Sequence, residues 1–121
     1  MNFYIRQNST LPELNVEFEF NSYKNFTQQD FYKRLQNSSI TFSLQDSEKC
    51  YYSIKCKPAQ LIEIEDCIDK NCSPKFIIQY KFDKKDTKKI GKFIGEFTVV
   101  FNDNGDILRL PIKRELIVNI V

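Results

Sequence analysis

Four cysteines are the residues of this chain whose type could bind a metal or form a disulfide: Cys50, Cys56, Cys67 and Cys72. Structural zinc sites usually use cysteine pairs about two to four residues apart, whereas five residues separate Cys50 from Cys56. On a continuous strand these two sulfurs would share a face but lie about 20 Å apart, at ~3.3 Å per residue. We therefore expect no metal and no cofactor, and we expect free thiols, with Cys50 and Cys56 in the core.

Cys67 and Cys72 have four residues between them in a polar stretch, so a disulfide closing that loop is the alternative state. Disulfides persist in oxidising compartments. The first ten residues contain Arg6 and no apolar run of signal-peptide length, which predicts no secretory route. Free thiols remain the expectation here as well.

A lysine-rich segment, residues 81–92, could contact an anion. It holds Lys81, Lys84, Lys85, Lys88, Lys89 and Lys92 around Asp83 and Asp86, which leaves it at net +4. A single-strand nucleic-acid site needs exposed aromatic side chains between the basic ones, and none is interleaved here. We predict a solvated loop between strands; a second interpretation is that Lys84, Lys85, Lys88 and Lys89 meet an acidic surface on a partner protein.

Catalytic groups are poorly represented. The chain has no histidine, which removes the usual base for serine or cysteine nucleophiles. Glu63, Glu65, Asp66 and Asp69 cluster without an apolar pocket that could raise a carboxyl pKa. Only three glycines occur, too few for a phosphate-binding glycine loop. We expect a protein that is not an enzyme, and the net charge of +2 predicts no general affinity for nucleic acid.

Asp103, Asn104 and Asp106 around Gly105 faintly suggest a calcium loop. The twelve-residue calcium pattern with its terminal glutamate is absent from the sequence. Asn and Gly both tolerate positive φ, so this segment is better explained as a tight hairpin turn.

The elements that position these residues can be predicted from alternation of apolar side chains. Leu14, Val16, Phe18 and Phe20 alternate with mostly acidic residues and predict a strand that begins after Pro12. A short helix is expected at about 28–36, with Thr27 as its N-cap and Phe26 packed against Phe31.

Two strands are expected next. Ile40, Phe42 and Leu44 mark the first, and Cys50, Tyr52, Ile54 and Cys56 give the second a core face. Pro58 ends that strand, because proline cannot donate to the ladder. A short edge strand at 61–64 and a polar loop at 66–73 complete this part.

Residues 75–121 predict three consecutive antiparallel strands with one buried face. That face comprises Phe76, Ile78, Tyr80, Phe82, Phe93, Gly95, Phe97, Val99 and Phe101, followed by the apolar positions from Ile107 to Ile120. In the last run, Ile117 and Val121 lie opposite Leu116 and Val118, so the final strand is either central in a covered sheet or covered by another protein. In total we predict one all-β domain, residues 1–121: a two-sheet sandwich of about seven or eight strands with one short helix. No run of eighteen apolar residues occurs, so no membrane contact is expected.

Several short motifs carry a resemblance to a known family. They are Asp86-Thr87-Lys88-Lys89, Gly91, Phe93, Gly95-Glu96-Phe97, Asn104-Gly105, Leu110-Pro111-Ile112 and Leu116-Ile117-Val118-Asn119-Ile120, with Ile40-Thr41-Phe42-Ser43-Leu44 upstream. The stretch of roughly 39–121 resembles the immunoglobulin-like domain of phage baseplate upper proteins and related virion components.

The resemblance implies an immunoglobulin-like sandwich and a structural role in a tailed-bacteriophage virion, assembled in the host cytoplasm. The expected partners are capsid or tail and baseplate subunits, in multiple symmetry-related copies, with no specific nucleic acid. A baseplate or tail adaptor, or a module for host-surface glycan built on Tyr51 and residues 65–69, is the alternative. The candidate contact residues are Phe3, Tyr4, Ile5, Lys84, Lys85, Lys88, Lys89, Ile117 and Val121.

Overall fold

The computed structural model describes residues 1–18, 33–48, 51–68, 71–111 and 114–121. Within these ranges the chain forms nine strands and one helical turn at 33–36. The strands are β1 (Asn2–Ile5), β2 (Leu14–Phe18), β3 (Ser38–Asp46), β4 (Tyr52–Pro58), β5 (Gln60–Ile68), β6 (Asn71–Tyr80), β7 (Gly91–Phe101), β8 (Ile107–Leu110) and β9 (Leu116–Ile120). The predicted helix at about 28–36 is seen only from residue 33, since its first part lies outside the described residues.

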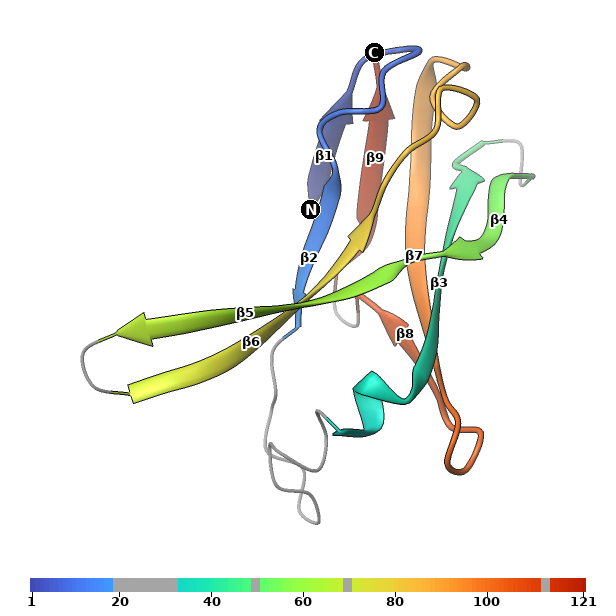
Figure 1. Cartoon of the computed structure of the whole chain (residues 1–121). Helices are drawn as coiled ribbons and strands as arrows, with labels where there is room; N and C mark the ends of the chain where they lie inside the picture. Colours follow the sequence, from blue (N-terminus) through green and yellow to red (C-terminus); the bar gives the residue numbers. More distant parts are fainter. Residues whose placement is uncertain (19–32, 49–50, 69–70, 112–113) are drawn as a thin grey trace.

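The strands form two sheets that pack as a sandwich (Figure 1). The six-stranded sheet has the order β1-β9-β7-β3-β4, with β8 beside β9 on the same edge of β7, and the three-stranded sheet has the order β2-β6-β5. β1 runs parallel to β9, and the other pairs are antiparallel. In variable-type immunoglobulin domains, the strand order B-E-D faces the order G-F-C-C′. Here β2-β6-β5 take the places of B-E-D, and β9-β7-β3-β4 take the places of G-F-C-C′. The predicted all-β two-sheet sandwich is therefore confirmed, with nine strands in the described ranges where about seven or eight were expected.

Phe42 on β3 is the centre of the core between the two sheets. Its side chain is fully buried, and its ring centroid lies 4.5 Å from that of Tyr80 on β6 and 4.8 Å from that of Phe97 on β7. Gly95 makes room for this ring, because a Cβ there would lie 3.2 Å from Phe42 and 3.1 Å from Leu116. The buried face predicted for the last third of the chain is confirmed at Phe76, Ile78, Tyr80, Phe82, Phe93, Gly95, Phe97, Val99 and Phe101.

The predicted order of the last strands was wrong in two respects. β6 belongs to the three-stranded sheet and β7 to the six-stranded one, so residues 81–90 cross between layers instead of linking sheet neighbours. The last run is two strands, β8 and β9, because Pro111 has no N–H to continue the ladder. A cis peptide bond precedes Pro111, and another precedes Pro12.

The core position predicted for Cys56 was also wrong, because this residue is exposed. Its backbone has φ +51°, and the pairing of β3 with β4 shifts register beside it, so the alternation of β4 is interrupted. Ile54 is buried as expected, whereas Tyr52 is 52% exposed. Cys50 lies outside the described residues.

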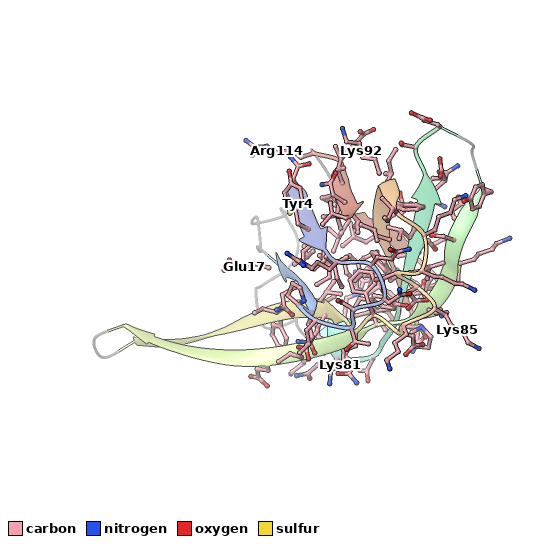
Figure 2. The ribbon with its side chains drawn as sticks, turned by 90° about the horizontal axis from the view of Figure 1, so that it is seen from above. Tyr4, Glu17, Lys81, Lys85, Lys92 and Arg114 are labelled. Atoms are coloured by element: carbon pink, nitrogen blue, oxygen red, sulfur yellow. The ribbon has the colours of Figure 1, made fainter. Side chains whose placement is uncertain are left out.

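β5 is an edge strand, as predicted, but it is longer than the expected 61–64. The predicted polar loop at 66–73 is instead largely the end of a hairpin, with Cys67 and Cys72 at opposed backbone positions. β2 pairs with β6 only from Phe76 to Tyr80, so residues 64–68 and 71–75 pair only with each other among the described strands. We call this two-stranded ribbon the hairpin arm. Figures 1 and 2 both show it projecting from the sandwich.

Candidate docking surfaces

Asp86 anchors the link that crosses between the sheets. Its buried carboxylate accepts hydrogen bonds from the hydroxyl of Tyr80 at 2.7 Å and from the backbone N–H of Asp83 at 2.9 Å. The ammonium of Lys57 on β4 lies 2.7 Å from the same carboxylate. Burial, and then the hydrogen bond to Asp86, raises the pKa of Tyr80 above its ordinary value. The base of the lysine-rich segment is therefore fixed by charge-assisted hydrogen bonds.

The same segment is tied to the link between β1 and β2. The buried hydroxyl of Thr87 donates to the carbonyl of Ser9 at 2.8 Å, and the N–H of Asn8 donates to the carbonyl of Thr87 at 3.0 Å. The side-chain amide of Gln7 donates to the carbonyl of Lys88 at 2.8 Å. The lysines are exposed, as predicted for a solvated loop, but their backbone is held on two sides.

A groove of about 550 Å³ opens beside this segment, and we call it the corner groove. Its lining residues are Gln7, Tyr51, Ser53, Lys85, Asp86, Lys88, Lys89, Ile90 and Phe93. The ammonium of Lys89 hydrogen-bonds the hydroxyl of Tyr51 and lies 4.8 Å from the centroid of its ring. Tyr51 thus supplies the aromatic neighbour that the lysines lack in sequence. The sequence offers little signal for this contact, because 38 positions separate the two residues.

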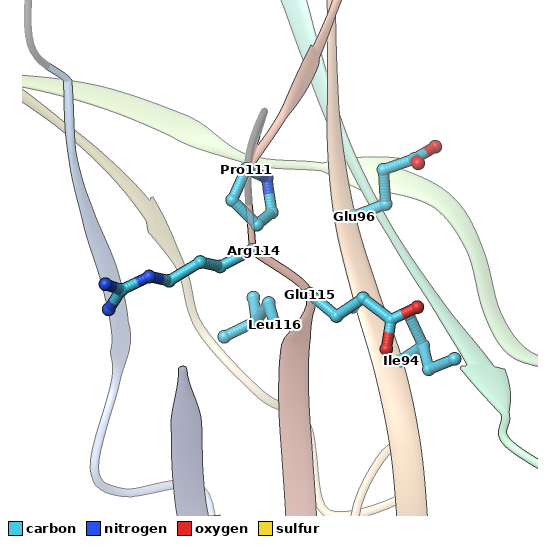
Figure 3. A pocket seen from close by; sticks show the side chains of 7 residues that line it. Ile94, Glu96, Pro111, Arg114, Glu115 and Leu116 are labelled. Atoms are coloured by element: carbon cyan, nitrogen blue, oxygen red, sulfur yellow. The ribbon is translucent and has the colours of Figure 1, made fainter.

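The outer face of the six-stranded sheet carries two shallow depressions that share Ile94 and Glu96 on β7. One, of about 350 Å³, extends over β3 to Tyr52 and Cys56 on β4. The other, of about 230 Å³, is bounded by the link between β8 and β9. Figure 3 shows the side chain of Glu115 directed toward Ile94 in the second depression. Half-buried Ile94 and exposed charged side chains such as Glu96 and Arg109 therefore share this face.

The candidate contact residues near the termini lie in different environments. β1 is an edge strand, and Tyr4 is 61% exposed there, whereas Ile5 belongs to the core. Phe3 is half-buried and stacks on Phe82 at 5.8 Å. Ile5 therefore presents no side chain to a partner in this structure, while Tyr4 does.

β9 is central, between β1 and β7. The side chain of Ile117 is half-buried on the outer face of the sheet, where the neighbouring strands cover part of it. Val121 is 57% exposed, and its carbonyl accepts a hydrogen bond from the N–H of Gln7 at 2.8 Å. The C-terminal residue thus lies beside the corner groove. The four candidate lysines, Lys84, Lys85, Lys88 and Lys89, are exposed in the same corner.

The acidic turn between β7 and β8 forms ion pairs with Arg34 of the helical turn at 33–36. The guanidinium of Arg34 lies 2.7 Å from a carboxylate oxygen of Asp103 and 3.4 Å from Asp106, and it stands 4.7 Å over the ring of Phe101. The hydrogen bond from Arg34 lowers the pKa of Asp103, and the same contact raises that of Arg34. The predicted hairpin between β7 and β8 is confirmed. Of its two residues that tolerate positive φ, Asn104 and Gly105, only Gly105 has one, at +77°.

The remaining predicted sites are not assembled by the described residues. No three His, Cys, Asp or Glu side chains gather as a metal site would need in the ranges that the structure describes. The prediction about Cys67 and Cys72 stays untested, since their side chains are not among those described. The two parts of the glycan candidate do not meet, because the start of β4, next to Tyr51, and the end of the hairpin arm lie on opposite sides of the molecule (Figure 1).

Comparison of this chain with protein-family models, with curated proteins and with solved structures finds no match. None of the helical residues that the structure describes forms a segment long and apolar enough to cross a membrane.

Proposed function

We propose that this chain is a non-enzymatic docking module, and that it serves as an auxiliary structural protein of a tailed-bacteriophage virion. The resemblance of residues 39–121 to virion immunoglobulin-like domains supports the virion role. The hairpin arm supports docking, and it is the observation that carries the proposal.

The arm is a two-stranded ribbon, a structure that is marginal in water without a third strand or a packing layer. β5 is the edge strand of the three-stranded sheet, so the outer edge of residues 64–68 has no strand partner among the described residues. An unpaired edge presents a row of N–H and C=O groups that a strand of another protein can pair with. A neighbouring virion subunit that adds such a strand would supply what the isolated arm lacks.

The outer face of the six-stranded sheet, with its two depressions, is the second contact surface of this proposal. Two modest contacts on one module, repeated over many symmetry-related copies in a particle, give high avidity without a tight single site. Docking of this kind, on capsid or tail subunits, would stabilise the particle.

The test uses a variant that shortens the arm and leaves the rest of the sheet intact. Residues 65–74 are replaced by Asn-Gly, so that Ile64 and Lys75 remain paired and flank a two-residue turn. The pairing of β2 with Phe76 to Tyr80 is untouched. We expect the variant to fold, as measured by cooperative urea unfolding, and to be lost from virions when it replaces the native chain in the phage that encodes it.

The matched control is Lys33→Gln, an exposed change away from the arm, which should leave incorporation at the native level. The proposal of docking through the arm is contradicted if the shortened variant is folded and enters particles as the native chain does. The virion role is contradicted separately if purified particles contain no native chain.

A further inference from the structure

The corner groove combines a local excess of positive charge with a fixed shape. The lysine-rich segment carries net +4 in a chain of net +2, so the rest of the chain is net negative. Within the groove, the carboxylate of Asp86 is matched by Lys57 at 2.7 Å. Lys85, Lys88 and Lys89 of the lysine-rich segment all line the groove.

The groove has a pinned backbone. Hydrogen bonds from Gln7 to Lys88 and from Thr87 to Ser9 connect the lysine-rich segment to the link between β1 and β2. The hydrogen bond between Lys89 and Tyr51 connects the same segment to the residue before β4. Preorganised walls reduce the ordering cost of binding.

The groove also has apolar surface. Ile90 on its rim is 59% exposed, whereas Phe93, behind the lining, is fully buried and offers no surface to a ligand. Tyr51 is 37% exposed beside them. A free inorganic anion would leave this apolar surface in water, whereas a peptide with both acidic and apolar side chains would cover it.

Single-stranded nucleic acid fits less well. Such sites stack successive bases on several exposed aromatic rings. Tyr51 is the one aromatic side chain with substantial exposure in the groove lining, and the ammonium of Lys89 already stands over its ring. The charge of the groove therefore points to carboxylates on a polypeptide.

We propose that the corner groove binds an extended acidic segment of a partner protein, with carboxylates on Lys85 and Lys88 and an apolar side chain against Ile90. This inference goes beyond docking through the arm and the outer face, and it does not depend on the virion role. Attraction between the lysines and an acidic partner would make association of the two proteins faster at low salt.

The test measures fluorescence anisotropy of a labelled octapeptide of six glutamates and two leucines with the native chain. The groove variant is Lys85→Gln with Lys88→Gln, and the matched control is Lys33→Gln with Lys55→Gln, which removes the same charge elsewhere. Exposed ion pairs are individually modest, so we expect the groove variant to bind about five- to tenfold more weakly and the control to bind as the native chain does. Binding should also weaken as salt rises.

Three results would overturn the proposal. Equal losses in the two double variants would show attraction to net charge without a site. A thymidine oligonucleotide of equal charge that binds more tightly than the peptide, with the loss confined to the groove variant, would assign the groove to nucleic acid. Absence of peptide binding at low salt and millimolar protein would leave the groove without this ligand. A second peptide with glutamine for glutamate should not bind.

Discussion

The carboxylate of Asp86 accepts a hydrogen bond from the hydroxyl of Tyr80 at 2.7 Å, at the point where the chain leaves one sheet for the other. Tyr80 closes the end of β6, and Asp86 sits in the link that leads to β7. One buried contact therefore fixes both the core aromatic cluster and the base of the corner groove.

Removing the carboxylate should be more harmful than removing the hydroxyl. Asp86→Ala leaves the hydroxyl of Tyr80 and the N–H of Asp83 without this acceptor, whereas Lys57 is 42% exposed and keeps Asp83 at 3.8 Å, so we expect a loss of about 2–4 kcal/mol of unfolding free energy. Tyr80→Phe keeps the ring and the contact with Lys57, so its expected loss is about 1–3 kcal/mol. Urea unfolding measures both. Equal losses would contradict the assigned role of the carboxylate.

Gly95 should resist even one added methyl group. A Cβ there would lie 3.1 Å from Leu116 and 3.2 Å from the ring of Phe42, so Gly95→Ala should cost about 1–3 kcal/mol by overpacking. The same substitution in a Phe42→Leu background should cost less, because the smaller side chain relieves the contact. Thermal or urea unfolding of the four proteins tests this. An unchanged cost in the Phe42→Leu background would show that the ring is not the obstacle.

The acidic turn should give a pH dependence at low pH. Because Arg34 lowers the folded-state pKa of Asp103, the stabilising contribution of this carboxylate is present above its unfolded pKa of about 3.9. It is lost as the pH falls through the lowered, folded-state pKa. NMR titration should show the pKa of Asp103 below the ordinary range in the native chain and near it in Arg34→Gln. The same pKa in both proteins would refute this coupling.

Cys56 should report whether the outer face is covered. Its exposure predicts that iodoacetamide modifies it in the folded protein, as peptide mapping by mass spectrometry would show. If the outer face docks on a partner, the modification should slow several-fold in the assembled particle. A rate at Cys56 that is the same in the particle would exclude this part of the face from the contact.

Alternation predicted which side chains are buried better than it predicted which strands are neighbours. The buried positions of β6 and β7 were right, because period-two patterning reports the face of a strand. That pattern is the same whether the next strand lies in the same sheet or across the core, so the crossing at 81–90 was missed. Pro111 could have indicated the break between β8 and β9, since it lacks the N–H that a continuous strand needs.

The candidate surfaces were less predictable than the fold. The exposure of Cys56 depends on a positive φ that a non-glycine residue rarely adopts, and nothing in the residue types around it indicates this. The contact between Tyr51 and Lys89 joins distant positions through the sheet topology. The lysines themselves were recognised from the sequence, because a charge excess is visible without any fold.

The most direct test of docking through the hairpin arm is amide hydrogen exchange, measured on the free chain and on the chain in purified virions. We predict that amides of residues 64–68 and 71–75 exchange quickly in the free chain, compared with those of β7, and become protected in the particle, where a neighbouring strand covers them. Arm amides that exchange at the same rate in both states, in particles that contain the chain, would contradict the central claim.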